Sequence, residues 1–154
     1  MKFSTREDIE APVDYVFGQV SDFGAFERQA LRRGAEVRRV DSGPFKEGSS
    51  WDVAFKFRGK DRNMRANLEH LDAPNGFRIE TVANGIDGLT QVDLVPLSPH
   101  RTRIAVSIDL TAKSLSARLL LQSLKLAKSN LTNRFKKRIA DFSQDIEDRY
   151  RTGA

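Results

Sequence analysis

Apolar and polar residues alternate with a period of two through most of residues 35–112. The clearest run is Trp51, Val53, Phe55 and Phe57, whose intervening residues are mostly charged. Turns rich in glycine, proline and asparagine divide the region into six segments. This pattern predicts a meander of six antiparallel strands with one dry face and one wet face.

The residues before this region predict a strand followed by two short helices. Residues 2–10 are expected to form the strand, and Pro12 suits the first turn of a helix because its missing N–H is not needed there. A second short helix is expected to turn Phe26, Ala30 and Leu31 inward and to end at Gly34.

Residues 114–151 contain neither proline nor glycine, and their apolar residues recur at steps of three, four or seven. This spacing predicts one long helix with a single apolar stripe. A seven-stranded sheet with one dry face needs a cover, and this helix is the only predicted element long enough. The stripe consists of Leu124, Leu131, Phe135, Ile139, Phe142, Ile146 and Tyr150.

Length and composition indicate one α+β domain over residues 1–154, with ten phenylalanines for its core. The chain has no cysteine, which excludes disulfides, thiolate metal sites and a cysteine nucleophile. The first residues lack the apolar region of a signal peptide, and no apolar run has the length of a membrane span. We therefore expect a cytoplasmic protein.

Three segments follow one another along the chain: IEAPVDYVFGQVSD at residues 9–22, the glycine before an apolar strand in residues 48–57, and RTRIAVSIDL at residues 101–110. In this order they resemble the START-like (SRPBCC, Bet v 1-like) superfamily, in particular its bacterial polyketide cyclase/dehydrase-like branch. The resemblance implies a helix-grip fold, in which a curved seven-stranded antiparallel sheet with two short helices wraps a long C-terminal helix. It also implies a cavity between sheet and helix, used in different members for lipids, quinones, hormones, polyketide intermediates or partner proteins.

The sequence therefore predicts the binding or carrying of a small hydrophobic ligand in that cavity, without a cofactor. The alternative is a cyclase or dehydratase acting on a ligand in the same place. Two histidines without cysteine cannot form a histidine- or cysteine-based zinc site, so no metal is expected. The expected lining is Trp51, Val53, Phe55, Phe57, Met64, Leu68, Phe77, Ile79, Ile104, Val106, Ile108, Leu124, Lys128, Leu131 and Phe135.

Two residues are the candidates for catalysis. His70 alternates in step with Met64 and Leu68, so it is either a proton shuttle inside the cavity or a hydrogen-bonded histidine at the end of its strand. Lys128 falls within the apolar stripe of the long helix. Its ammonium group either reaches the helix edge or enters a wet cavity, where it pairs with a carboxylate or enolate of the ligand.

The long helix also carries the positive charge of the chain, whose formal net charge is +5. Residues 113–154 contain ten Lys/Arg and four Asp/Glu. Leu115, Leu119 and Leu126 lie on the side opposite the stripe, which predicts either an anionic membrane surface at the inner membrane face or a homodimer contact. The remaining alternative is a bend near Ser129-Asn130 that lets the first half of the helix pack differently. Nucleic acid is not expected, because the basic residues are not interleaved with aromatic ones.

Overall fold

The computed structural model describes residues 1–153, and within them the chain forms seven strands and four helices. The order along the chain is that expected from the sequence, except at the last helix. The elements are β1 (Lys2–Ile9), α1 (Val13–Val20), α2 (Phe23–Arg32), β2 (Glu36–Arg39), β3 (Ser50–Phe57), β4 (Lys60–Asp72), β5 (Gly76–Ala83), β6 (Ile86–Ser98), β7 (Arg101–Ala112), α3 (Leu115–Lys125) and α4 (Lys128–Thr152).

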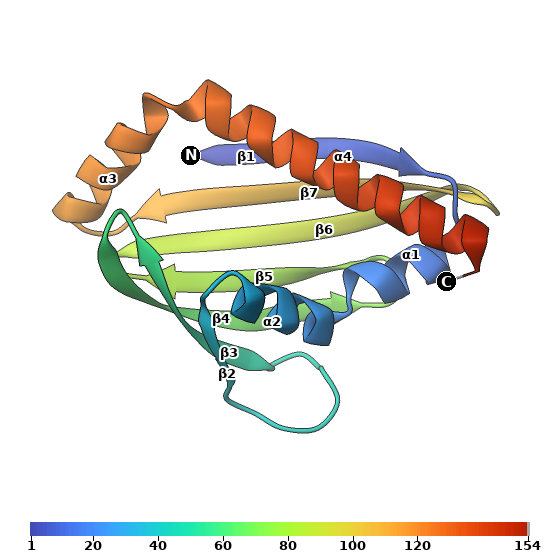
Figure 1. Cartoon of the computed structure of the whole chain (residues 1–154), viewed down its shortest axis with the longest axis horizontal. Coiled ribbons are helices and arrows are strands. Elements are labelled where there is room, and N and C mark those ends of the chain that lie inside the picture. Colours follow the sequence, from blue (N-terminus) through green and yellow to red (C-terminus); the bar gives the residue numbers. More distant parts are fainter. Residues whose placement is uncertain (154) are drawn as a thin grey trace.

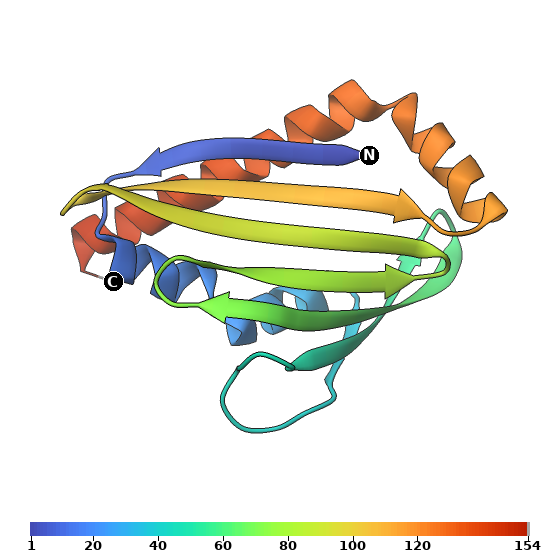
Figure 2. The same ribbon diagram turned by 180° about the vertical axis from the view of Figure 1, so that it is seen from behind.

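The strands form one antiparallel sheet in the order β1-β7-β6-β5-β4-β3-β2. Strands β2 to β7 follow one another as hairpins, and β1 pairs with β7 at the far edge, from Lys2 opposite Asp109 to Ile9 opposite Thr102. The sheet is strongly curved, and all four helices lie on or beside its concave side (Figures 1 and 2). This is the helix-grip arrangement that the sequence predicted.

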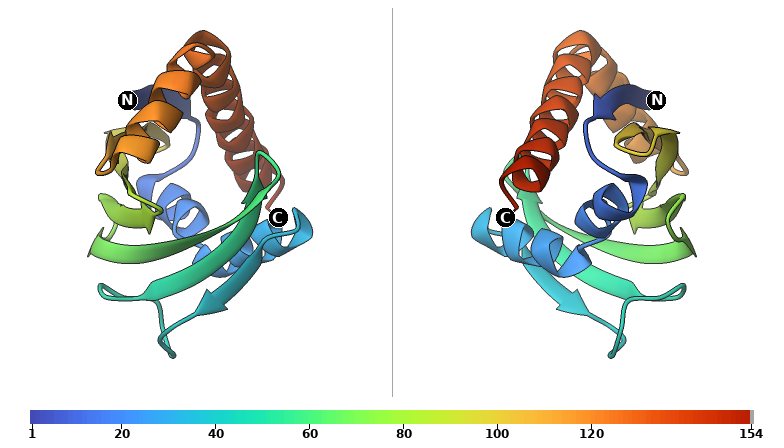
Figure 3. Two further views of the ribbon diagram at one scale, coloured as in Figure 1. Left: turned by 90° about the vertical axis from the view of Figure 1, so that its left-hand side faces the viewer. Right: turned by 90° about the vertical axis from the view of Figure 1, so that its right-hand side faces the viewer.

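The two ends of the curved sheet are covered by different helices. In the end-on views, α4 lies near the β1 edge and α2 near the β2 edge (Figure 3). The main core lies between α1, α4 and the β1, β7 and β6 side of the sheet, where Ile9, Val16, Ile104 and Ile146 have at most 1% of their surface exposed. Phe135, Ile139 and Phe142 of α4 pack against this core, as the apolar stripe predicted.

The prediction of one helix over residues 114–151 is wrong, because the helix is broken at Leu126 and Ala127. α3 buries Ala117 and Leu121, whereas α4 buries Ser143 and Ile146, and the two helices run in different directions (Figure 1). The bend considered near Ser129-Asn130 therefore exists a few residues earlier. No proline or glycine marks it, so packing of each helix against a different part of the sheet decides its place.

Candidate functional site

Two adjoining cavities lie between α2 and the sheet. The smaller, called the apolar cavity below, has a volume of about 330 Å³, and the larger, called the wide cavity, about 1000 Å³. Both are lined by Phe26, Ala30 and Val53, so they form one continuous concave site. The sequence placed the cavity against the C-terminal helix, but no residue of α3 or α4 lines either cavity.

The reason for this difference is the position of α4. It packs directly on β1, where the rings of Phe3 and Phe135 are 6.2 Å apart, and on α1, where Tyr15 and Tyr150 are 5.0 Å apart. Large side chains thus occupy the apolar space between α4 and its half of the sheet. A further cavity of about 530 Å³, which Lys136 of α4 lines, is walled mainly by polar residues of β1, β6 and β7. The other half is covered by α2, a helix of ten residues, and by Phe45 of the β2–β3 loop.

The apolar cavity is walled by side chains from five strands and one helix, with one ionisable group among them. That group is Glu27, whose Oε1 accepts a hydrogen bond from Trp51 Nε1 at 2.8 Å. The pair holds the indole ring against the cavity wall and satisfies its only donor. The lining is Phe23, Phe26, Glu27, Ala30, Val37, Trp51, Val53, Ala66, Phe77, Ile79, Thr90 and Val92.

The wide cavity contains an arginine whose charge has no partner. Arg62 lies on the inward face of β4, and its Nε is enclosed without a hydrogen-bond partner. Its guanidinium carbon lies 5.7 Å from the ring centroid of Phe57, and it forms no ion pair with any residue in 1–153. An enclosed donor without a partner costs about 1–3 kcal/mol. A ligand group that accepts a hydrogen bond would recover that cost.

The loop between β2 and β3 forms the outer support of Trp51. Phe45 from this loop stacks on Trp51 with centroids 6.0 Å apart, and Arg39 lies 4.2 Å above the Phe45 ring. Phe23 of α2 contacts the same two rings, at 5.4 and 5.8 Å. This aromatic cluster fixes one wall of the apolar cavity.

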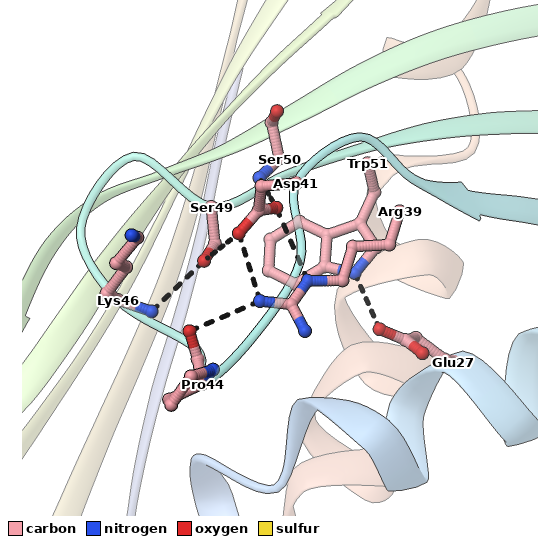
Figure 4. A network of polar contacts seen from close by, with 8 residues as sticks. All are labelled: Glu27, Arg39, Asp41, Pro44, Lys46, Ser49, Ser50 and Trp51. Atoms are coloured by element: carbon pink, nitrogen blue, oxygen red, sulfur yellow. Dashed lines mark hydrogen bonds and ion pairs between the residues drawn. The ribbon is translucent and has the colours of Figure 1, made fainter.

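A network of hydrogen bonds around the partly buried carboxylate of Asp41 holds that loop in place (Figure 4). Asp41 accepts hydrogen bonds from Arg39 Nη2 at 2.9 Å, from Ser49 Oγ at 2.9 Å and from the Ser50 N–H at 3.1 Å. Ser49 in turn accepts a bond from the Lys46 N–H at 3.0 Å. The Arg39 guanidinium, with the N–H of Ser50, holds the pKa of the Asp41 carboxyl well below its usual range.

Six of the fifteen sequence-predicted lining residues line the two cavities. Trp51, Val53, Phe77 and Ile79 line the apolar cavity, and Val53, Phe55 and Met64 line the wide one. The remaining residues line neither cavity: Leu68, Ile104 and Val106 are buried core, Ile108, Leu124, Leu131 and Phe135 are half-buried, and Phe57 is exposed.

His70 lines neither the apolar cavity nor the wide cavity. A β-bulge shifts the register of β4 and β5 between Leu68 and His70, so the alternation that places Leu68 inward is broken before His70 is reached. The histidine side chain is 57% exposed, and its Nδ1 lies 3.3 Å from Glu47 Oε1. It is therefore the polar histidine at the strand's end, not a group inside the cavity.

Lys128 is not part of a buried stripe. It is the first residue of α4, directly after the break at Leu126 and Ala127, and it is exposed. Lys128 would share a face with Leu124 and Leu131 only on a continuous helix, and the break between α3 and α4 removes that continuity. Lys128 lies outside both cavities.

Sequence reasoning missed Glu27 and Arg62. Arg62 shares the parity of Met64, Ala66 and Leu68, so the alternation of β4 already placed it on the inward face. Glu27 follows Phe26 on a helix whose inward face was predicted from Phe26, Ala30 and Leu31. The first two do line the site, whereas Leu31 is 53% exposed. No sequence pattern pairs Glu27 with Trp51.

Within residues 1–153, no group of three or more His, Cys, Asp or Glu side chains is placed to hold a metal ion. None of the helices in this part of the chain has the length and apolarity needed to cross a membrane.

Known structures share this architecture. The ZhuI aromatase/cyclase of Streptomyces sp. R1128 is 12% identical, with 97% of this chain and 94% of that chain covered and a TM-score of 0.66. Norcoclaurine synthase of Thalictrum flavum, solved with dopamine and hydroxybenzaldehyde, is 14% identical, with 95% and 85% covered and a TM-score of 0.63. Ara h 8.0201 is 13% identical, with 99% and 98% covered and a TM-score of 0.62.

A scan of protein-family models and a search of curated proteins gave no match. At identities of 12–14% the structural likeness shows the fold alone. The chain thus has the helix-grip fold of the START-like, Bet v 1-like superfamily, as its sequence predicted.

Proposed function

We propose that this chain binds a small, largely apolar molecule carrying one anionic group, with the apolar part in the apolar cavity and the anion at Arg62. A volume of about 330 Å³ lies within the ordinary range for small-molecule sites, and the adjoining wide cavity provides the entrance. Affinity comes from apolar area, and orientation comes from a few polar groups.

The observation that carries the proposal is Arg62, whose enclosed Nε has no hydrogen-bond partner and which lines the wide cavity adjoining the apolar cavity. Inward-facing cations are normally paired, because an unpaired charge out of water is costly. A carboxylate meets a guanidinium through two parallel hydrogen bonds, so it is the acceptor that fits this group best. Noncatalytic binding is preferred to a cyclase or dehydratase reaction, because His70 and Lys128 lie outside the site.

Dodecanoate and dodecanol test the proposal as a matched pair, since they differ only at the polar end. Trp51 emission and calorimetric titration report occupancy of the apolar cavity. We expect dodecanoate to bind at least about tenfold more tightly than dodecanol, because charged hydrogen bonds contribute about 1.5–3 kcal/mol. If neither compound changes Trp51 emission or raises the Tm, the proposal fails.

The Arg62→Met and Arg62→Lys variants test whether the preference for dodecanoate comes from the charge of Arg62 or from the apolar cavity. Arg62→Met should bind the two compounds equally, whereas Arg62→Lys should keep part of the preference for dodecanoate. Arg58→Met is the matched control, because Arg58 also lies over Phe57, at 5.5 Å, but lines neither cavity. A preference for dodecanoate that survives in Arg62→Met would assign the anion to another group.

A further inference from the structure

α3 is apolar on two faces, and only one of them is covered. Its inner face buries Ala117 and Leu121 against the sheet. On the outer face Leu115, Leu119 and Leu126 are 73%, 59% and 92% exposed. These three leucines are spaced by four and seven residues, so they lie in one row. We call this row, with Arg118 and Lys125 of the same helix and Lys128 just after the break, the α3 face.

The cations of the α3 face are free to meet an anionic partner. Arg118, Lys125 and Lys128 form no ion pair with any residue in 1–153, whereas the nearby Lys113 lies 3.9 Å from Asp87. Residues 113–140 contain eight Lys/Arg and no Asp or Glu. The β3–β4 turn adds Arg58, whose Nη1 donates a hydrogen bond to Ser123 Oγ at 2.8 Å.

We propose that the α3 face docks on an anionic lipid surface, with the three leucines inserted between the headgroups and the cations at the phosphate level. Leu126 is at the corner where α3 ends, with Lys125 and Lys128 close to it in sequence, and the corner projects from the body of the molecule (Figure 1). A projecting apolar side chain surrounded by cations suits the boundary between acyl chains and anionic headgroups.

A second copy of the chain is a poorer occupant of this face. A twofold contact places each patch against its own copy, so the cations of one α3 face would meet the same cations of the other. The absence of acidic residues from 113–140 leaves nothing in that segment to compensate the repulsion. This inference does not depend on the cavity, because no residue of the α3 face lines either cavity.

Sedimentation of the full chain with vesicles tests the proposal. Vesicles of phosphatidylcholine with about 30 mol% phosphatidylserine should bind the protein, and pure phosphatidylcholine should bind it at least about tenfold more weakly. Binding should fall as the salt concentration rises from about 0.05 to about 0.5 M. Absence of binding to the anionic vesicles at low salt would refute the proposal.

Substitutions locate the docking surface. Leu119→Glu with Leu126→Glu should lower the partition coefficient by at least about tenfold, and each of Lys125→Glu and Lys128→Glu by about fivefold or more. All four side chains are exposed, so the Tm should not change.

The matched controls are Leu97→Glu and Lys46→Glu. Leu97 is 42% exposed near the end of β6, at the opposite end of the molecule from α3, and Lys46 is exposed in the β2–β3 loop. Both controls should bind the vesicles as the wild type does. An equal loss of binding in the controls would mean that the overall charge of the protein, and not the α3 face, determines binding. If sedimentation velocity shows that the wild type is a dimer and that the leucine variants are monomers, the α3 face binds a second copy of the chain instead of lipid.

Discussion

The two halves of the sheet are covered in opposite ways. The half formed by β1, β7 and β6 lies under α4, a helix of 25 residues, and its inward side chains Ile104 and Thr102 are at most 1% exposed. The half formed by β2 to β5 lies under α2, a helix of ten residues, and its inward side chains range from Leu68, which is 0% exposed, to Val53 and Ile79 beside the cavity, which are only half-buried. At 1.5 Å per residue the helices are about 38 and about 15 Å long.

The apolar free space of this domain therefore lies in the half under the short helix. Long α4 carries Phe135, Phe142 and Ile146 into the first half and fills its apolar interior. Short α2 presents Ala30 where a large residue would be needed to fill the second half. The closed half stabilises the fold, and the open half is left for a ligand.

The largest expected effect is from truncating one isoleucine in each half. Ile146→Ala should lower the free energy of unfolding by about 2–5 kcal/mol, because it leaves a cavity in a packed core. Ile79→Ala should cost clearly less, since its side chain already borders a cavity. Urea denaturation measures both, and equal losses would contradict the division into a closed and an open half.

A larger side chain should have different effects on stability in the two halves of the sheet. Val106→Trp in the closed half should destabilise the protein by about 1–3 kcal/mol through overpacking. Val53→Trp, which lines both cavities, should leave the Tm unchanged or raise it and should weaken dodecanoate binding at least about tenfold. Thermal unfolding measures the change in Tm, and calorimetric titration measures the change in affinity for dodecanoate. Unimpaired binding by Val53→Trp would place the ligand elsewhere.

A smaller effect concerns the polar pair in the wall of the open half. Glu27→Leu removes the acceptor of the Trp51 Nε1–H bond and should cost about 1–2 kcal/mol, with a shift of Trp51 emission. Glu27→Gln keeps an acceptor oxygen and is the matched control. If the two variants have the same stability and emission, the hydrogen bond does not position the indole.

The smallest effect should come from the loop network that supports Trp51. The Arg39 guanidinium lowers the pKa of Asp41 below its ordinary value of 3.8, so ionised Asp41 stabilises the fold above that pH. This stabilisation is lost as the pH falls below 3.8 toward the lower folded-state pKa. Asp41→Asn should therefore lower the Tm at pH 7, and the difference from wild type should shrink progressively below pH 3.8.

The control for this experiment is Asp145→Asn, which removes an exposed carboxylate of α4. Its Tm should equal that of the wild type across the same pH range. A difference between Asp41→Asn and wild type that persists unchanged in acid would mean that the charge of Asp41 has no part in holding the loop.

Local patterns in the sequence determined the elements and the faces of this protein. Period-two alternation predicted Trp51, Val53, Phe55 and Met64 as inward residues, and the structure places all four on cavity walls. Arg62 belongs to the same alternating set of inward residues, because successive side chains in a strand point to opposite faces of the sheet. The elements and the inward face of each strand can therefore be predicted without knowing which distant segments are in contact.

Only the tertiary structure decided which helix borders the cavity, where the C-terminal helix breaks and which way His70 points. Each depends on contacts between segments far apart in the chain: Phe135 against Phe3, α3 and α4 against different parts of the sheet, and the bulge of β4 against β5. A register shift of one residue reverses the inward and outward faces, and a packing break needs no proline or glycine. For these reasons local periodicity leaves an interior position open for Lys128 and His70, and the fold places both outside the two cavities between α2 and the sheet.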